Sequence, residues 1–242
     1  MKFAPAFRTS LAAFLLMPMS ASALAQLKPE AQLGSRLAVQ PKTADPAVAA
    51  RISKDVAKCV LMGRSMFVTK FLNNSDPVQV DFKMIGTTER KIAGDLGMPN
   101  CLEAQMNITQ SAVQMSFPIS TLRTLLAEES YLKVYENSPD LPENAVEAVA
   151  RHFVSQGDDL SRARGLAAFA DCITFNDTAG ADKVLRTVPR SVDEKAAARA
   201  LAPTLGKCLV AGQTVSLTSE NIRAIVADGL WSRFVYGSKP NA

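Results

Sequence analysis

Four cysteines offer the first chemistry in this sequence, because cysteine thiols either pair as disulfides or bind metal ions. They are Cys59, Cys101, Cys172 and Cys208, and no two of them form a C-x-x-C motif. A zinc site takes four ligands and His152 is the single histidine, so zinc would use almost every cysteine. An even cysteine count in an oxidising compartment favours two disulfides instead. We therefore predict disulfides, no metal ion and no cofactor.

Two arginines, Arg123 and Arg223, are the next candidates, because each occupies the same place in one of two similar helices. A guanidinium group binds carboxylate or phosphate oxygens in pairs, so an anion or ligand site is one interpretation. A long helical side chain, however, leans towards the N-terminus of its own helix. The favoured interpretation is therefore that both arginines anchor loop carbonyls or a carboxylate to their helices.

Catalytic motifs are not found in the sequence. A catalytic triad would depend on His152, and the chain has no G-x-S-x-G, no H-E-x-x-H and no glycine-rich phosphate loop. Adjacent acids such as Glu128 and Glu129 do not face each other on a helix, so they do not predict a carboxylate dyad. We name no catalytic residue and expect no enzymatic activity. An enzyme with a site that sequence motifs do not show stays as an alternative.

The N-terminus predicts export. Lys2 and Arg8 give a positive start, the apolar run 11–17 follows, and small residues at 23 and 25 suit a signal peptidase. We expect residues 1–25 to be a signal peptide that is cut after Ala25, which places the mature chain in the periplasm or outside the cell. No later stretch reaches 18 apolar residues, so no transmembrane segment is predicted.

The charge pattern argues against a nucleic-acid partner. Removal of the signal peptide takes away Lys2 and Arg8, so the net charge of +4 falls to +2. Aromatic residues are 6% of the chain, and no basic block occurs. Binding to nucleic acid needs a basic surface and usually stacking rings. We expect an envelope protein or a small ligand as the partner instead.

The periodicity of apolar residues predicts a mainly α-helical chain. Asp45 and Pro46 are typical of a helix start, and Ser191 with Glu194 has capping-box spacing. Alternating apolar residues predict strands in two places, which together would form a small β element. Helices are expected at 45–59, 64–74, 87–97, 121–131, 140–156, 161–175, 181–187, 191–202 and 221–231, and strands at 78–86 and 112–118.

The sequence contains two related halves. The stretch 121–131 matches 221–231 in its arginine, alanine, acid and aromatic positions, which helical periodicity alone does not explain. Around the cysteines, 56–59 matches 169–172 and 100–102 matches 207–209. We predict two tandem helical repeats in one pseudo-twofold domain, with the β element in the first. Their arrangement is a lead-in at 26–44, repeat 1 at 45–136, a linker and helix at 137–158, repeat 2 at 159–237 and a tail at 238–242.

The repeats leave two symmetric disulfide pairings. One joins Cys59 to Cys101 and Cys172 to Cys208, so that each repeat has its own bridge. The other joins Cys59 to Cys172 and Cys101 to Cys208, which would link the repeats to each other. The first is favoured because a single ancestral copy could have folded alone with it.

The pattern that runs from the cysteine helix at 169–172 to the arginine–alanine helix at 221–231 resembles uncharacterised exported proteins of alpha-proteobacteria. The resemblance covers most of 159–235 and extends to 46–135. It implies an exported, internally duplicated helical protein and no particular activity. The function that we predict is a non-enzymatic binding or protein-interaction module, with an envelope structural protein as the alternative.

Overall fold

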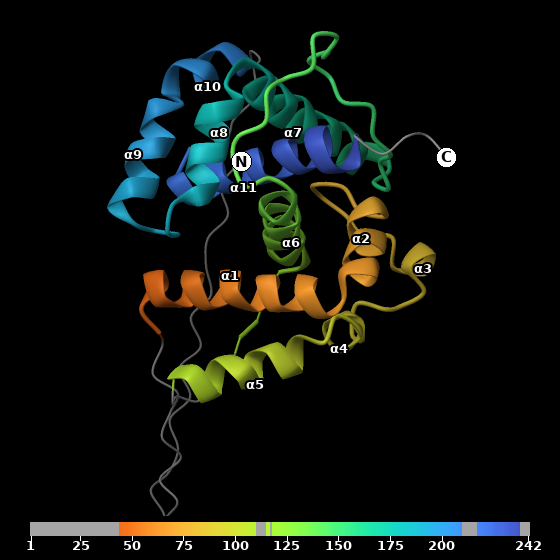
Figure 1. The fold of residues 1–242 in the computed structure, drawn as a ribbon. Helices are drawn as coiled ribbons and strands as arrows, with labels where there is room; N and C mark the ends of the chain where they lie inside the picture. The colour runs from red at the N-terminus through yellow and green to blue at the C-terminus, as the bar shows by residue number, and fades with distance from the viewer. Residues whose placement is uncertain (1–43, 110–114, 117, 210–216, 238–242) are drawn as a thin grey trace, which may run out of the picture. The chain divides into compact units, whose positions relative to one another are not determined.

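A computed structural model describes residues 44–109, 115–116, 118–209 and 217–237, and within these ranges the chain is mainly helical and has no strand. None of the helices in these ranges is long and apolar enough to cross a membrane. Figure 1 shows their arrangement. The elements are α1 (Pro46–Gly63), α2 (Ser65–Asn73), α3 (Phe82–Ile85), α4 (Ile92–Asp95), α5 (Met98–Thr109), α6 (Ile119–Val134), α7 (Gly157–Asn176), α8 (Thr178–Arg186), α9 (Val192–Ala200), α10 (Ala202–Cys208), α11 (Ser219–Leu230) and the π-helical turn η1 (Trp231–Tyr236).

Short polar side chains begin several of these helices. The Asp45 carboxylate accepts hydrogen bonds from the first backbone N–H groups of α1, and Pro46 occupies the first helical turn, as predicted. The Ser191 hydroxyl accepts from the Glu194 N–H at 3.0 Å and starts α9. Thr218 does the same for α11 through the Asn221 N–H at 3.2 Å. Each contact satisfies a backbone donor that a helix start leaves without an intrahelical partner.

The strand predicted at 78–86 is wrong. The backbone there forms one isolated bridge, between Ser75 and Val80, and then the short helix α3. The Asp76 carboxylate accepts from backbone N–H groups at 78 and 79, and Asp81 caps α3 by accepting from the Met84 N–H. These side chains hold the segment in turns, which compete with strand pairing. The strand predicted at 112–118 lies largely outside the described residues.

The helix predicted between Asp140 and Gln156 is also absent, and residues 135–156 form an irregular connection. Its backbone donors find carboxylates of distant helices and turns. The Val149 N–H donates to Asp171 at 2.8 Å, and the N–H groups of residues 154 and 155 donate to Asp76. Burial alone would raise the pKa of Asp76, but hydrogen bonds from Gln79, Ser155 and Val78 lower it. Tertiary hydrogen bonds have therefore replaced the helical ladder in this connection.

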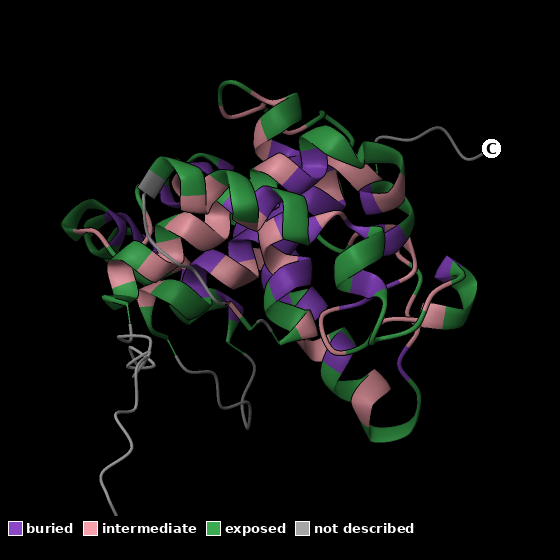
Figure 2. Ribbon diagram, turned by 90° about the horizontal axis from the view of Figure 1, so that it is seen from below, coloured by how far each residue is buried: buried purple, intermediate pink, exposed green. Residues whose placement is uncertain are grey.

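The hydrophobic core has two parts, and each part receives an aromatic ring from the other half of the chain. The first part lies among α1, α2, α5 and α6, and it includes Trp231 of η1. The second lies among α7, α8, α9, α10 and α11, and it includes Tyr131 of α6. In Figure 2 the buried residues gather where the helices face one another. The crossing of α6 and α11 therefore joins the two parts of the core.

The central helices α6 and α11 have the same succession of exposed, partly buried and buried positions. From residue 118 to 131, the sequence of exposed, partly buried and buried positions is identical to that from 218 to 231. Their neighbours also correspond, because α6 packs on α1 and α2 whereas α11 packs on α7 and α8. The two halves of the described chain thus present equivalent faces to these helices.

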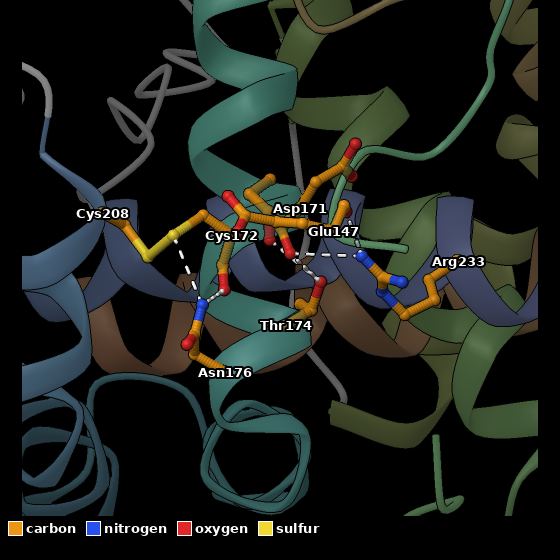
Figure 3. The surroundings of a disulfide bond; sticks show 8 residues. Glu147, Asp171, Cys172, Thr174, Asn176, Cys208 and Arg233 are labelled. Carbon is orange, nitrogen blue, oxygen red and sulfur yellow. Dashed lines mark hydrogen bonds between the residues drawn. A yellow bond between two sulfur atoms is a disulfide. The ribbon is translucent and has the colours of Figure 1, made fainter. Parts of the chain in front are cut away.

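One disulfide lies in each half. Cys59 of α1 is bonded to Cys101 of α5, and Cys172 of α7 is bonded to Cys208 of α10, which is the pairing that the sequence favours. The sequence separations are 42 and 36 residues. In the chain-entropy model, closing loops of this length stabilises the fold by about 4 kcal/mol each. Figure 3 shows that the second bridge adjoins Asn176, whose amide donates to the Cys172 carbonyl at 2.9 Å.

The contact between α7 and α11 depends on Gly229. A Cβ atom at this position would lie 2.6 Å from the Ala170 carbonyl oxygen and 2.7 Å from the Thr174 methyl carbon. We expect Gly229→Ala to lower the free energy of unfolding by about 1–3 kcal/mol, because the helices must separate to admit the methyl group. Urea unfolding of the oxidised protein measures the change.

Gly206→Ala is the matched control, since nothing lies within 4 Å of a Cβ atom at that helical position. Alanine there should keep or raise stability, because it favours the helix more than glycine does. Equal stability of the two variants would contradict the close approach of α7 and α11.

Candidate functional site

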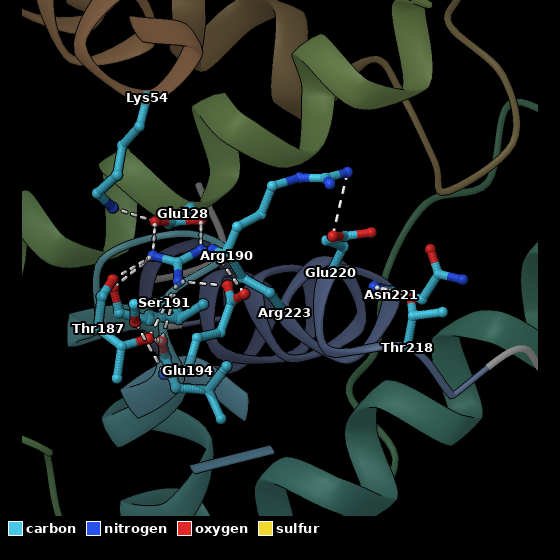
Figure 4. Close-up of polar contacts among 12 residues, drawn as sticks. Lys54, Glu128, Thr187, Arg190, Ser191, Glu194, Thr218, Glu220, Asn221 and Arg223 are labelled. Atoms are coloured by element: carbon cyan, nitrogen blue, oxygen red, sulfur yellow. Dashed lines mark hydrogen bonds and ion pairs between the residues drawn. The ribbon is translucent and has the colours of Figure 1, made fainter. Parts of the chain in front are cut away.

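Arg223 of α11 is buried and is surrounded by acceptors. Its guanidinium donates twice to Glu128 of α6, at 2.9 Å from Nε and 2.7 Å from Nη2. It also donates to Glu194 of α9 at 2.9 Å and to carbonyl oxygens at the end of α8, among them that of Leu185 at 2.7 Å. Figure 4 shows this cluster. Two carboxylates and several carbonyl oxygens thus accept hydrogen bonds from the guanidinium group.

Arg123 of α6 makes the corresponding contacts on the other side. Its Nη1 lies 2.7 Å from Oδ1 of Asp228 in α11, and its Nε donates to the Ser75 hydroxyl at 3.1 Å. Ser75 lies just after the C-terminal end of α2. The carbonyl oxygens that Arg223 contacts lie likewise at the C-terminal end of α8. The guanidinium carbon also lies 5.5 Å from the centre of the Trp231 ring. Both arginines therefore reach a helix end within their own half and a carboxylate in the other half.

The two ion pairs are exchanged between α6 and α11. Arg123 pairs with Asp228, and Arg223 pairs with Glu128. Residues 123 and 223 are a hundred positions apart, and so are residues 128 and 228. Such reciprocity is the property of an interface between two copies related by a twofold axis.

Lys54 of α1 extends the cluster to the adjacent acid of α6. Its ammonium group contacts Glu128 and lies 2.8 Å from Glu129. Burial raises the pKa of Glu129, and the Lys54 charge opposes that change only in part. The position equivalent to Glu129 in α11 is Gly229. The first half therefore has an ion pair at the position where the second half has a close contact between helices α7 and α11.

Arg151 brings the irregular connection into the same network. Its guanidinium contacts Asp171 of α7 and donates to Asp228 and to the Ser232 hydroxyl, both at 2.7 Å. Burial alone would raise the pKa of Asp228, but the guanidinium groups of Arg123 and Arg151 outweigh it and lower that pKa. Burial prevails at Asp171, whose pKa is raised. Arg151 thus fastens residues 135–156 to both α7 and α11.

Five of these charged residues form the floor of a cleft of about 760 Å³ that we call the central cleft; they are Arg123, Glu128, Glu194, Arg223 and Asp228. Positions 120, 121, 123, 124, 125 and 128 of α6 line it together with the six positions one hundred residues later in α11. Parts of α1, α7 and the loop between α8 and α9 complete the walls. Its volume lies within the range of small-molecule sites, about 300–1,000 Å³.

The exposed charges of the central cleft lie at its rim. Arg190 lines the cleft from the loop between α8 and α9, and its guanidinium lies 3.1 Å from the Glu220 carboxylate of α11. Arg162 of α7 is exposed and has no ion-pair partner within the described part of the chain. Arg190 has a φ of 61°, a left-handed conformation that costs an arginine roughly 1–2 kcal/mol relative to a glycine.

The structure brings some of the sequence-predicted residues together and separates others. Arg123 and Arg223 lie on the floor of the central cleft, whereas the four cysteines are outside its lining. His152 lies in the irregular connection rather than on a helix, and its side chain is exposed. Within the described ranges, no group of three or more histidine, cysteine or acidic side chains could hold a metal ion.

Sequence reasoning missed the partners of the arginines. The signal was present, because both halves carry an acid five residues after the arginine. On a helix, residues at that spacing do not face each other, so a repeated pair predicts contacts between helices instead. Lys54, Arg151 and Arg190 have no counterparts at the equivalent positions and could not be found in this way.

Comparison with known proteins gives no relative for this chain, because no family model, curated protein or solved structure matches it. The argument for function therefore depends on the geometry of the central cleft.

The exchanged ion pairs generate a stability prediction. Arg223→Met should lower the free energy of unfolding by about 3–5 kcal/mol, because Glu194 would stay buried without its cation and Glu128 would keep only Lys54. Arg199→Met, on the exposed side of α9, is the control for loss of an arginine. Urea unfolding at neutral pH measures both.

Glu194→Gln added to Arg223→Met should restore part of that loss, since the carboxylate that has lost its cation is removed. If Arg223→Met were as stable as Arg199→Met, the buried pairs would not hold α6 to α11.

The raised pKa of Glu129 generates a prediction on pH. The folded protein keeps the Glu129 proton at a higher pH than the unfolded chain, so ionisation of this group disfavours folding. Its contribution to stability therefore falls as the pH rises from about 4.3, the ordinary value for glutamate, through the raised value. Lys54, Lys58 and Glu128 are the charges that act on it.

The Glu129→Gln variant has no carboxyl group at this position, so its stability does not include this fall with rising pH. The difference in unfolding free energy, variant minus wild type, should therefore increase between about pH 4.5 and pH 7. Urea titrations across that range measure it, with Glu143→Gln on the exposed connection as the control substitution. A difference that decreases with pH would show that the pKa of Glu129 is lowered in the folded protein.

Proposed function

We propose that this protein is an exported, non-enzymatic binding module that holds a small ligand in the central cleft. The single observation that carries the proposal is the cleft itself, which is about 760 Å³ in volume and lies where α6 and α11 meet. Concave sites with apolar walls and a few convergent polar groups are the usual form of a small-molecule site. Half-buried Leu125, Leu166 and Ile225 contribute such walls.

Export is the second part of the proposal. The N-terminal 25 residues have the pattern of a signal peptide with cleavage after Ala25, and the mature chain would act in the periplasm or outside the cell. Two disulfides in one small chain are compatible with an oxidising compartment. The resemblance to uncharacterised exported proteins of alpha-proteobacteria points to the same location.

We also propose that the domain arose by duplication of one helical unit, with repeats at 45–136 and 159–237 around a pseudo-twofold axis. Three correspondences support it. The arginine–carboxylate pairs are exchanged between α6 and α11, each core receives the ring of the other half at position 131 or 231, and the burial order of α6 recurs in α11. The central cleft would then lie on the axis that relates the repeats.

Binding is favoured over catalysis because the buried ionisable groups of the cleft hold one another. Glu128, Glu194 and Asp228 each contact a guanidinium group, so their charges serve the helix contact. A general base needs a carboxylate or imidazole that is within reach of the substrate. An enzyme, a structural protein of the envelope and a module for a protein partner are the alternatives.

A thermal-shift screen of the mature protein against a small-molecule library tests the proposal. A ligand that binds only the folded state stabilises it by RT ln(1 + [L]/Kd), about 2.7 kcal/mol at a hundredfold excess over Kd. We expect at least one compound to raise Tm. Ala224→Phe, which fills the cleft wall on α11, should abolish that rise, whereas Ala196→Phe on the exposed side of α9 should keep it.

Two results would contradict this function. A ligand whose effect survives Ala224→Phe would bind outside the central cleft. A screen without any stabilising compound, together with a reproducible protein partner in cross-linking of the cell envelope, would favour an interaction module. Turnover of a bound compound, abolished by one polar substitution, would make the protein an enzyme.

A further inference from the structure

We infer that the ligand of the central cleft is a small organic carboxylate with an apolar body, whose carboxylate is bound by Arg190 at the rim. This inference rests on the proposed function and specifies the chemistry of the same site. Three observations on the rim lead to it, namely the charges that stay accessible, the backbone conformation of Arg190 and its exposed contact with Glu220, and the apolar walls below the rim add a fourth.

The first observation is the balance of charges. The lining has four arginines and four acids. Each of the three buried acids of the lining, Glu128, Glu194 and Asp228, contacts at least one cation inside the protein. Arg162, Arg190 and Glu220 remain with exposed side chains. The rim therefore offers one net positive charge, which complements a ligand that carries a single negative charge.

The second observation is the backbone of Arg190. Its φ of 61° lies in the left-handed region, where glycine is free of strain and arginine is not. The local fold does not require this side chain, because the contact that ties the loop to α9 is made by the backbone N–H of Arg190 to Glu194 at 2.8 Å. Residues held in such conformations cluster at ligand sites. The Arg190 side chain therefore has its role at the cleft.

The third observation is the contact that Arg190 makes in the free protein. Figure 4 shows its side chain extending to Glu220 of α11, 3.1 Å away. Both side chains are well exposed, at 39% and 45%, and an exposed pair of this kind is weak. A ligand carboxylate can take the place of Glu220, and a guanidinium group can bind such a carboxylate with two hydrogen bonds.

The apolar walls select the body of the ligand. Leu125 and Ile225 occupy equivalent places on α6 and α11, and Leu166 lies on α7. All three are partly exposed, so an apolar ligand would cover surface that water now contacts. A ligand with its carboxylate at Arg190 would direct its apolar body towards these side chains.

Three probes with the same apolar chain test the inference: octanoate, octanol and octyltrimethylammonium. Binding of each to the mature protein is measured by isothermal titration calorimetry, with Tm as the second readout. We expect octanoate to bind at least tenfold more tightly than octanol, and octyltrimethylammonium to bind more weakly than octanol.

Two variants of the rim should change octanoate binding in opposite directions. Arg190→Gly should weaken it about tenfold or more while it keeps or raises Tm, because glycine suits the left-handed backbone. Glu220→Gln should strengthen it severalfold, because the competing carboxylate is removed. Arg199→Ala, on the exposed side of α9, is the control and should bind octanoate as wild type does.

The outcomes separate this inference from the proposed function. Tighter binding of octanol or of the cation, lost in Ala224→Phe, would overturn the carboxylate and leave the cleft as a binding site. Octanoate binding that Arg190→Gly does not weaken would also overturn it. If none of the three probes binds, the carboxylate inference fails, and the library screen alone decides whether the cleft binds another class of ligand.

Discussion

The exchanged ion pairs between α6 and α11 are the interaction on which the rest of the structure depends. A guanidinium group inside a protein loses its hydration, and only a well-placed carboxylate and further acceptors make up for that loss. Arg123 pairs with Asp228 of the opposite half, and Arg223 pairs with Glu128 of the opposite half as well as with Glu194 of its own. The first half therefore could not bury Arg123 alone without leaving its charge uncompensated. The crossing of the two helices is therefore fixed by electrostatic compensation as well as by apolar packing.

That crossing determines what the surrounding elements do. It carries Tyr131 into the core of the second half and Trp231 into the core of the first, so the two cores are joined by their largest side chains. The disulfides lie further from this crossing. Each ties two helices of one half together, α1 to α5 and α7 to α10. Arg151 then attaches the irregular connection to the centre. Covalent bonds thus hold each half, and charged contacts hold the halves to each other.

Sequence reasoning succeeded where local patterns decide the outcome. The helix that begins at Asp45, the mainly helical fold and the pairing of the cysteines follow from caps, periodicity and the matching halves. It failed at 78–86, where Asp76 and Asp81 hold the backbone in local turns. It also failed at 140–156, where Asp76 and Asp171 accept from backbone N–H groups of a distant segment. Those distant partners are determined by the tertiary fold, so no local window of sequence contains them. The central cleft was missed for the same reason, because five helices and two loops line it.

The differences between the halves determine what the cleft can distinguish. On α6 the central cleft is lined by the hydroxyl-bearing residues Ser120, Thr121 and Thr124. The equivalent positions on α11 are Glu220, Asn221 and Ala224. Arg190 also belongs to the α11 side of the cleft, because it pairs with Glu220. A site on a perfect twofold axis would bind a ligand equally in two orientations. Charge on one wall and neutral hydroxyls on the other remove that equivalence, so a ligand with one polar end should bind in a single orientation. The buried pairs below are alike in both halves, and the selectivity of the site therefore lies at its rim.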